Sequence, residues 1–394
     1  MFNRIRSDFK PIIIFIMIIA IMVMVAPGIW AQTWSAPKRL TWNSGDSSQP
    51  VIARDSSDNL HMIWHDDSPG NDELFYKKST DGGMTWIGIK RLTWTAADST
   101  SQEIVIDSSD HIHCVYVEKL SETDPAQIFY KKSTNSGTTW SPPAQLTWNT
   151  GESFNPDIAV NSSNWLFIVW TDNSPGNFEI YSRMSSNQGN TWSAIKRLTW
   201  NTGFSSSVTI AIDAMDTIHI GWSDLTPGND EIFYKNSTDN GVSYSIPQRI
   251  TWNGGASQTP HISTDASNNI HLFWADRTPG NLEIYYKKST NNGSSWTGLK
   301  RLTWNTGDSK WPRNSVGVGN DHLYVFWYDF TVNSEIYYKN SLDGGGTWSA
   351  LKRITWTSSY SFCPDSVVDS NQTLHLIYYD NNPGNYEIYY RNRK

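Results

Sequence analysis

The sequence predicts an all-β fold, a seven-bladed β-propeller with four strands in each blade. An Arg-Leu-Thr-Trp-like motif recurs every 52 residues, with one step of 54, and a repeat of about 50 residues is typical of propeller blades. Each unit holds short, alternating, aromatic-rich segments between turn residues, a pattern that excludes helical repeats. The motif occurs seven times, ending at Trp42, Trp94, Trp148, Trp200, Trp252, Trp304 and Trp356.

The first unit gives the expected order of elements in a blade. We expect an innermost strand A over 51–54, strand B over 60–64, strand C over 73–77 and an outer strand D over 86–94. Ser-Ser-Asp-Asn, Ser-Pro-Gly-Asn and Asp-Gly-Gly separate these segments and predict the three turns. The glycine of Pro-Gly-Asn allows a positive φ in the B-to-C turn.

The two ends of the sequence predict how the ring closes. The last unit contains A, B and C strands and no D strand, whereas residues 33–42 match residues 191–200 almost letter for letter. We therefore expect the N-terminal strand to complete blade seven, which removes two free sheet edges. Residues 32–394 are predicted to be one domain without a linker.

Residues 1–31 read as a secretory signal peptide. A basic start precedes an apolar run of 15 residues, Ile12 to Ala26, and the small residue Ala31 follows. The alternative is an uncleaved N-terminal anchor, but a spanning helix needs about 20 apolar residues. We expect cleavage after Ala31, a secreted or extracytoplasmic location, and a monomeric mature chain without a membrane span.

Composition and charge exclude several classes of protein. Charged residues make up 18% of the chain and the formal net charge is -7, so a nucleic-acid partner is not expected, because phosphate recognition needs a basic face. The mean hydropathy of -0.50 excludes a multispanning membrane protein. Cys114 and Cys363 are the two cysteines. The predicted fold places a blade between them, so we expect no disulfide.

Tryptophan is unusually frequent, with 21 residues. Eighteen of them fall at three repeated positions: the end of the Arg-Leu-Thr-Trp-like motif, the end of strand B, and the position after the C-to-D turn. We expect these to pack between neighbouring sheets, because a large aromatic side chain buries much apolar area. Trp30, Trp165 and Trp311 lie outside the repeat.

Six C-to-D turns share the pattern Ser-x-Asp/Asn-x-Gly-x-Thr/Ser-Trp/Tyr. The Asp or Asn side chain is expected to accept hydrogen bonds from turn amides, and the Gly two residues on to adopt a left-handed conformation. The pattern resembles the Asp box, or bacterial neuraminidase repeat, of sialidase-like propellers. The acidic or amide positions are Asp81, Asn135, Asn187, Asp239, Asn291 and Asp343.

The resemblance implies the fold more than an activity. Asp boxes occur in sialidases and in propellers that are not hydrolases, and in that family they lie on the face opposite the catalytic site. Sialidases of this kind use three arginines, a tyrosine with a glutamate partner, and an aspartate. Here six arginines occupy one repeated strand D position, so no catalytic set carries over. They are Arg39, Arg91, Arg197, Arg249, Arg301 and Arg353.

A site is expected where the repeat is broken, at the mouth of the central channel. Alternation along strand A points its first and third residues toward the channel, and five first positions are ionisable. Trp311, beside Lys310 in the predicted D-to-A loop, is a candidate for stacking on a sugar. The ionisable set, our candidate ligand-binding residues together with Trp311, is Glu103, Asp157, His261, Arg313 and Asp365.

Three functions remain open on the sequence alone. The first is a secreted or cell-surface, non-catalytic binding propeller for glycans or a protein partner. The second is a glycoside hydrolase of the sialidase superfamily, with Glu103, Asp157 and Asp365 as weak catalytic candidates. The third is a structural envelope or interaction domain, for which the same residues would form an ordinary solvated channel mouth. We lean against an enzyme.

A histidine recurs at one strand B position in five blades. Phe167 and Tyr324 replace it in the other two, a substitution that a ring of metal ligands would not tolerate, so we expect these side chains to pack rather than bind metal. We predict no metal and no cofactor. The histidines are His61, His113, His219, His271 and His375.

Overall fold

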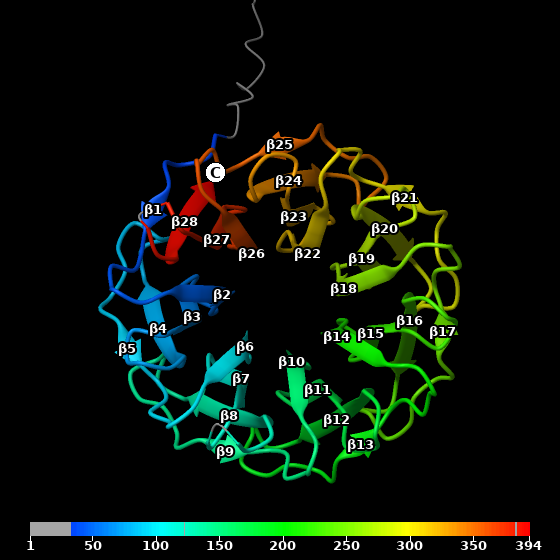
Figure 1. Cartoon of the computed structure of the whole chain (residues 1–394), viewed down its shortest axis with the longest axis horizontal. Helices are drawn as coiled ribbons and strands as arrows, with labels where there is room; N and C mark the ends of the chain where they lie inside the picture. The colour runs from blue at the N-terminus through cyan, green and yellow to red at the C-terminus, as the bar shows by residue number, and fades with distance from the viewer. Residues whose placement is uncertain (1–32, 122, 383) are drawn as a thin grey trace, which may run out of the picture. The chain divides into compact units, whose positions relative to one another are not determined.

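The computed structural model describes residues 33–121, 123–382 and 384–394. Over these residues the chain forms seven four-stranded antiparallel sheets arranged as a ring (Figure 1). The predicted seven-bladed propeller is confirmed. Among the described residues there is no helix of the length and apolarity needed to cross a membrane. The predicted signal peptide lies outside them.

The blades have nearly identical strand lengths. Blade one comprises β2 (Ser47–Arg54), β3 (Leu60–Asp66), β4 (Glu73–Ser79) and β5 (Lys90–Arg91), and blade two β6 (Ser99–Ile106), β7 (Ile112–Glu118), β8 (Gln127–Ser133) and β9 (Ala144–Gln145). Blade three comprises β10 (Ser153–Val160), β11 (Leu166–Asp172), β12 (Glu179–Ser185) and β13 (Lys196–Arg197), and blade four β14 (Ser205–Ile212), β15 (Ile218–Asp224), β16 (Glu231–Ser237) and β17 (Gln248–Arg249). Blade five comprises β18 (Ser257–Thr264), β19 (Ile270–Asp276), β20 (Glu283–Ser289) and β21 (Lys300–Arg301), and blade six β22 (Ser309–Val316), β23 (Leu323–Asp329), β24 (Glu335–Ser341) and β25 (Lys352–Arg353). Blade seven comprises β26 (Ser361–Val368), β27 (Leu374–Asp380), β28 (Glu387–Arg393) and β1 (Lys38–Arg39).

The N-terminal strand closes blade seven, as the sequence predicted. β1 pairs with β28 in the register Lys38 to Tyr390 and Arg39 to Tyr389. The Leu40 amide adds a hydrogen bond of 2.7 Å to the Ile388 carbonyl, and Leu40 is buried in the core between blades seven and one. The outer edge of β28 is therefore covered by the other end of the chain.

Two strand predictions need correction. Strand D is only two residues long, Lys90–Arg91 in blade one, rather than 86–94. Proline and glycine before this strand in several units limit ladder pairing. Strand A begins earlier than expected, at Ser47 in blade one, because the predicted loop before it joins the sheet through a β-bulge between Ser48 and Val51.

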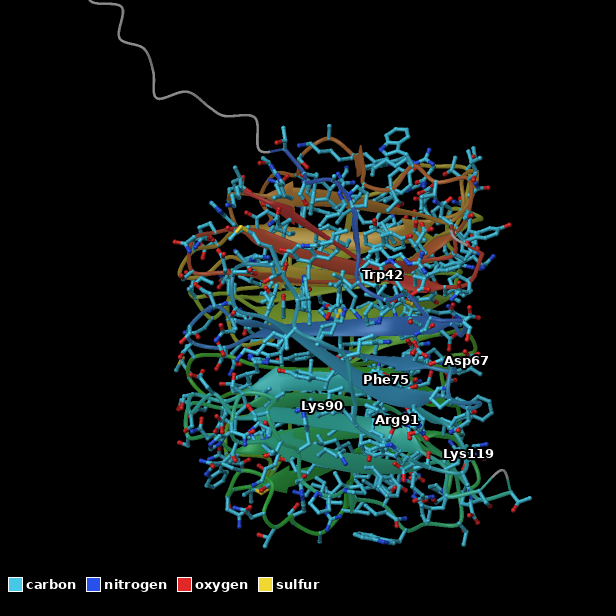
Figure 2. The ribbon with its side chains drawn as sticks, turned by 90° about the vertical axis from the view of Figure 1, so that its left-hand side faces the viewer. Trp42, Asp67, Phe75, Lys90, Arg91 and Lys119 are labelled. Carbon is cyan, nitrogen blue, oxygen red and sulfur yellow. The ribbon has the colours of Figure 1, made fainter. Side chains whose placement is uncertain are left out.

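The seven tryptophans that end the repeat motif do not pack between sheets. They are 64–73% exposed, and Trp42 lies on the outer wall of the ring (Figure 2). The reason is that strand D is the outermost strand and no further layer covers it. The prediction is wrong for this set, whereas the five tryptophans that end strands B are buried: Trp64, Trp170, Trp222, Trp274 and Trp327.

The repeated arginines of strand D are structural. In six blades the guanidinium forms an ion pair of 2.5–2.9 Å with a buried Glu at the start of strand C. It also lies 4.3–5.8 Å from the centroid of the exposed tryptophan ring. Blade two replaces both members of the pair, with Gln127 and Gln145 in their places.

A tyrosine in strand C joins each of six blades to the next. Its ring meets a tryptophan of the following blade edge to face, with centroids 5.1–5.5 Å apart. In five of these junctions its hydroxyl also lies 2.7–2.9 Å from Nδ1 of the strand B histidine. These tyrosines are Tyr76, Tyr130, Tyr234, Tyr286, Tyr338 and Tyr390.

Candidate functional site at the channel mouth

A β-bulge in every strand A shapes the mouth of the channel. The bulged residue adopts a left-handed φ of 43–57° in all seven blades, although none is a glycine. Such conformations cost energy and are retained where a backbone shape is required. The bulged residues are Gln49, Ser101, Asn155, Ser207, Thr259, Trp311 and Cys363.

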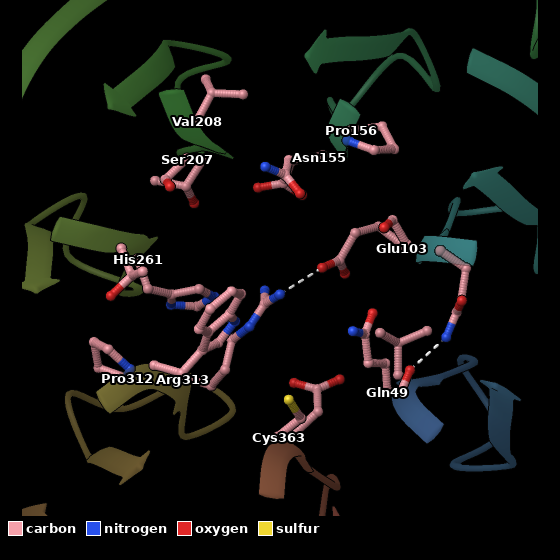
Figure 3. Close-up of a pocket in the computed structure, with 18 of the residues that line it drawn as sticks. Gln49, Glu103, Asn155, Pro156, Ser207, Val208, His261, Pro312, Arg313 and Cys363 are labelled. Carbon is pink, nitrogen blue, oxygen red and sulfur yellow. Dashed lines mark hydrogen bonds and ion pairs between the residues drawn. The ribbon is translucent and has the colours of Figure 1, made fainter. Parts of the chain in front are cut away.

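The bulges form a small recess lined by three residues from each blade. Its cavity volume is about 130 Å³. The five ionisable residues predicted for the channel mouth, Glu103, Asp157, His261, Arg313 and Asp365, all line this channel-mouth recess, as does Trp311. The structure thus brings the predicted set together; Figure 3 labels Glu103, His261 and Arg313 among them.

An ion pair spans the channel. The Arg313 guanidinium of blade six donates a hydrogen bond of 2.6 Å to Oε1 of Glu103 in blade two (Figure 3). Both side chains remain partly exposed, 25% and 18% respectively. Burial lowers the pKa of Arg313, but the carboxylates of Glu103, Asp365 and Asp157 outweigh it and raise that pKa above its usual value. Arg313 is therefore a permanent cation in the recess.

Two carboxylates of the recess also join neighbouring blades. Oδ2 of Asp157 accepts a hydrogen bond of 2.9 Å from the Ile210 amide, and Oδ2 of Asp365 accepts one of 2.9 Å from the Ile52 amide. Burial raises the pKa of Asp157 to about 7 and that of Asp365 to about 6. The charge of the recess therefore becomes more negative as the pH rises from 5 to 8.

His261 is neutral at physiological pH. Burial, followed by the Arg313 charge, lowers its pKa to about 3. Its Nδ1 lies 2.8 Å from Oδ1 of Asn314 in the next blade. A neutral imidazole can both donate and accept hydrogen bonds, whereas a protonated imidazole can only donate them. The neutral form therefore suits the binding of a ligand with hydroxyl groups.

Trp311 lies in a strand rather than in the predicted loop. It is the bulged residue of β22, with φ 57° and 43% of its surface exposed. Lys310 is in the same strand and forms an ion pair of 3.1 Å with Asp308. Cys363 is the bulged residue of β26 and also lines the recess. It was missed as a lining residue, although aligning all seven strands at the position of Trp311 would have found it.

The strand B histidines form a buried relay in five blades. In blade one, His61 Nε2 donates to Asp55 at 3.1 Å, and Nδ1 accepts a hydrogen bond from the Tyr76 hydroxyl. Where the histidine is replaced by Phe167 or Tyr324, the corresponding aspartate is Asn161 or Gly317. Both ring nitrogens of the strand B histidine thus have protein partners. The repeated histidine is therefore explained by its place in the buried core.

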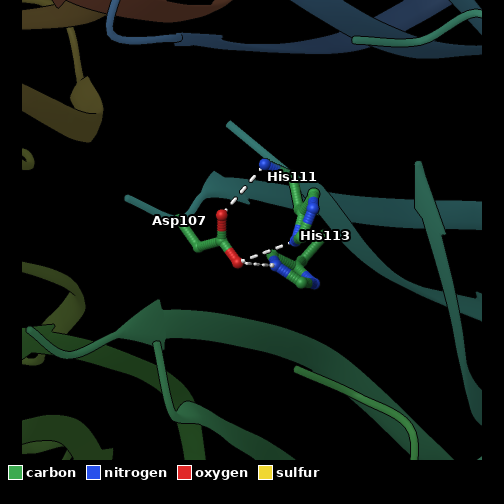
Figure 4. A group of neighbouring side chains, drawn as sticks. All are labelled: Asp107, His111 and His113. Carbon is green, nitrogen blue, oxygen red and sulfur yellow. Dashed lines mark hydrogen bonds and ion pairs between the residues drawn. The ribbon is translucent and has the colours of Figure 1, made fainter. Parts of the chain in front are cut away.

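One relay has a second histidine. Asp107 Oδ2 lies 3.2 Å from His113 Nε2 and 3.2 Å from His111 Nδ1 (Figure 4). The three side chains are close enough to offer ligand atoms to one ion. His113 Nδ1 is, however, occupied by the Tyr130 hydroxyl at 2.7 Å. The group has the same architecture as the other relays, and no metal role is assigned to it.

The Ser-Asp/Asn turns lie at the other end of the sheets. Strand pairing places Ser79 opposite Leu60, whereas Ser47, near the bulge, lies opposite Asp66. Within the first turn, the Asp81 carboxylate accepts hydrogen bonds from the Thr85 amide and hydroxyl. The turn glycines have φ of 76–85°. The predicted local geometry is confirmed, far from the channel-mouth recess.

Comparison with known proteins gives the fold alone. No protein-family model matches this chain, and no curated protein matches it. Among solved structures, an ulvan lyase holding a GlcA(1-4)Rha3S saccharide aligns with a TM-score of 0.65 at 10% identity, covering 89% of this chain and 95% of its own. An α-L-arabinofuranosidase from Fusarium graminearum aligns with a TM-score of 0.54 at 12% identity, covering 88% and 92%. A Hadza microbial sialidase aligns with a TM-score of 0.53 at 14% identity, covering 84% and 76%. The chain therefore shares a β-propeller fold with these three proteins.

Proposed function

We propose that this protein is a non-catalytic, saccharide-binding propeller and that the channel-mouth recess is its binding site. The observation that carries the proposal is that the bulge in strand A has the same backbone conformation in all seven blades, whereas the side chains at the bulge differ. Seven bulges of the same shape present Gln, Ser, Asn, Ser, Thr, Trp and Cys. A scaffold that only closes a ring has no need of an exposed tryptophan in a left-handed conformation at one of seven equivalent positions.

The side chains of the recess suit a saccharide. The exposed Trp311 ring offers an apolar face to the C–H face of a sugar. Arg313 has donors beyond the one that it gives to Glu103, and the carboxylates of Asp157 and Asp365 can accept from hydroxyls. The three structural neighbours, an ulvan lyase, an arabinofuranosidase and a sialidase, support the same class of ligand.

Glycoside hydrolysis is the second candidate. The raised pKa values of Asp157 and Asp365, about 7 and about 6, are what a general acid needs near neutral pH. Against this, each carboxylate already accepts a backbone amide of the next blade, an arrangement that fixes it as part of the scaffold. We therefore favour binding over hydrolysis.

Two further parts of the proposal rest on the sequence. The apolar run of 15 residues and the small residue Ala31 support export through a cleaved signal peptide. The six Ser-x-Asp/Asn turns support kinship with Asp-box propellers. Two other roles compete with this proposal: binding a cell-surface protein, and a structural role in an envelope. The experiment below distinguishes both from saccharide binding.

The experiment is a glycan-array screen of the mature protein, with a panel of chromogenic glycosides beside it. We expect selective binding to a group of related glycans and no release of chromophore. Binding to no glycan would overturn the proposal. Turnover that is lost in Asp157→Asn or Asp365→Asn, with the melting temperature kept, would replace it with the hydrolase.

A further inference from the structure

The junction between blades three and four departs from all the others. Strand C carries Ser182 where the six other blades have the tyrosine that joins neighbouring blades. Strand B carries Phe167 in place of the histidine, and the turn of blade four ends in Tyr244 in place of the tryptophan. Met184 stands where the other strands carry Lys or Asn. Four contacting positions have changed together.

These changes open a second cavity. It has a volume of about 350 Å³ and is lined by residues of blades three and four, among them Phe167, Ser182, Met184, Ile210, Val242 and Tyr244. Its lining comes mainly from β11 and β12 of blade three and from the turn 240–244 of blade four, with Ile210 of β14. None of these residues lines the channel-mouth recess. Figure 1 shows β11, β12 and β14 in the neighbouring blades three and four. Phe167 is buried and Val242 is 73% exposed, so the cavity runs from the core to the surface.

The other junctions show what fills this space. In five of them the tyrosine ring is stacked on the histidine ring at 6.0–6.1 Å and meets the tryptophan edge to face. A Cβ on the neighbouring turn glycine would lie only 2.0–2.4 Å from the tyrosine hydroxyl oxygen. At Gly241 the nearest atom to such a Cβ is 3.1 Å away and belongs to Tyr244. The ring that the fold normally places here is missing.

The two charged side chains of the cavity lining already have partners in the protein backbone. Lys196 Nζ donates to the carbonyls of Gly241 and Val242, at 2.8 and 2.6 Å. Arg183 donates to the carbonyls of Leu146 and Ser193. The charged groups of the lining are thus engaged by the backbone. Aromatic and aliphatic side chains, Phe167, Met184 and Ile210, supply much of the remaining surface.

We propose that the cavity between blades three and four binds a small monocyclic aromatic molecule, which takes the place of the absent tyrosine ring. Phe167 provides the face on which the ligand ring stacks, and Tyr244 provides the edge-to-face partner. In another protein an apolar cavity of about 150 Å³ is enough to bind benzene, so the space here is ample. This site is independent of the saccharide site proposed at the channel mouth.

The test uses p-cresol, which is the tyrosine side chain as a free molecule, and follows binding by ligand-observed NMR and calorimetry. We expect one equivalent to bind the wild-type protein, and Ser182→Tyr to weaken binding by at least about tenfold because the chain then fills its own cavity. Trp311→Ala, in the channel mouth, should leave p-cresol binding unchanged. Tyr234→Ser combined with His219→Phe, Asn236→Met and Trp296→Tyr, which copies all four changes at the junction between blades four and five, should add a second equivalent.

A structural readout keeps the test decisive if Ser182→Tyr does not fold. Crystals of the wild-type protein soaked with p-bromophenol should show the anomalous signal of bromine between Phe167 and Tyr244. The proposal is overturned if the wild-type protein binds no p-cresol, if Ser182→Tyr binds it as tightly as the wild type, or if the bromine lies elsewhere.

Discussion

Replacing Arg91 with Gln should be far more damaging alone than together with the same change at its partner, Glu73. The Glu73 side chain is fully buried, and Arg91 Nη2 lies 2.9 Å from its Oε1. Arg91→Gln would leave a buried carboxylate without its cation. Removing one partner of a buried pair typically costs about 3–5 kcal/mol. The Thr95 amide, 2.6 Å from the same oxygen, would still donate to it, so we expect about 2–4 kcal/mol.

The double variant should recover most of this loss, because blade two naturally has glutamine at both positions, Gln127 and Gln145. There the Asn149 amide donates to Gln127 Oε1 at 3.4 Å, Gln127 Nε2 donates to the Gly151 carbonyl at 3.1 Å, and Gln145 Nε2 donates to the Thr147 carbonyl at 2.8 Å. Two glutamines therefore satisfy the same backbone without any charge. We expect Glu73→Gln with Arg91→Gln to cost at most about 1 kcal/mol, so the coupling energy should be at least about 1–3 kcal/mol, to which the cost of Glu73→Gln alone is added.

The assay is equilibrium unfolding in urea at pH 7 for the wild type, both single variants and the double variant. Arg277→Gln is the matched control, because Arg277 is 50% exposed and lies 3.6 Å from Asp308 in a surface pair. Such pairs contribute about 0–1 kcal/mol. The reasoning is refuted if Arg91→Gln costs no more than Arg277→Gln, or if the double variant costs the sum of the two single ones.

Three further predictions concern stability and metal binding. Burial raises the pKa of Glu118 from 4.5 to about 7, so the folded protein holds an extra proton between these values and its stability falls as pH rises through that window. Glu118→Gln should therefore stabilise by on the order of 3 kcal/mol at pH 8 and hardly at pH 4, as urea unfolding would show. Deleting residues 32–42 should expose the outer edge of β28 and cause aggregation, measured by light scattering. A deletion variant that melts like the mature protein would contradict the closure. Elemental analysis should find no stoichiometric zinc or copper, and one equivalent lost on changing His219 and His271 together would refute the packing role of the histidines.

Much of the fold could be predicted from the sequence because the repeat itself carries the information. The spacing of the motif fixed the number of blades, and period-2 alternation in strand A placed Glu103, Asp157 and Arg313 at the channel mouth. The exposure of Trp42 and its equivalents could not be found this way. A tryptophan at a repeated position looks like a packing residue, and only the two-residue length of strand D shows that no layer lies outside it.

The details of the site depend on backbone geometry that residue patterns do not contain. The bulge that turns Trp311 and Cys363 into the recess is an extra residue in an otherwise regular strand, and the types found there, from Gln49 to Cys363, share no signature. The cavity beside Ser182 has a signal in the sequence, since the tyrosine is absent in one of seven repeats. That this absence leaves a cavity can be recognised only from the contacts that the tyrosine makes in the other six blades.

The measurement that tests the saccharide site most directly is a calorimetric titration of the best glycan from the array against three variants. Trp311→Ala and Arg313→Ala should each weaken binding, by about 1–3 kcal/mol for the loss of a ligand contact. Asp81→Ala changes a turn at the far end of the sheets, so it should lower stability by about 1 kcal/mol and leave affinity unchanged. If Asp81→Ala weakens binding while Trp311→Ala and Arg313→Ala do not, the ligand binds at the opposite face and the proposed site is wrong.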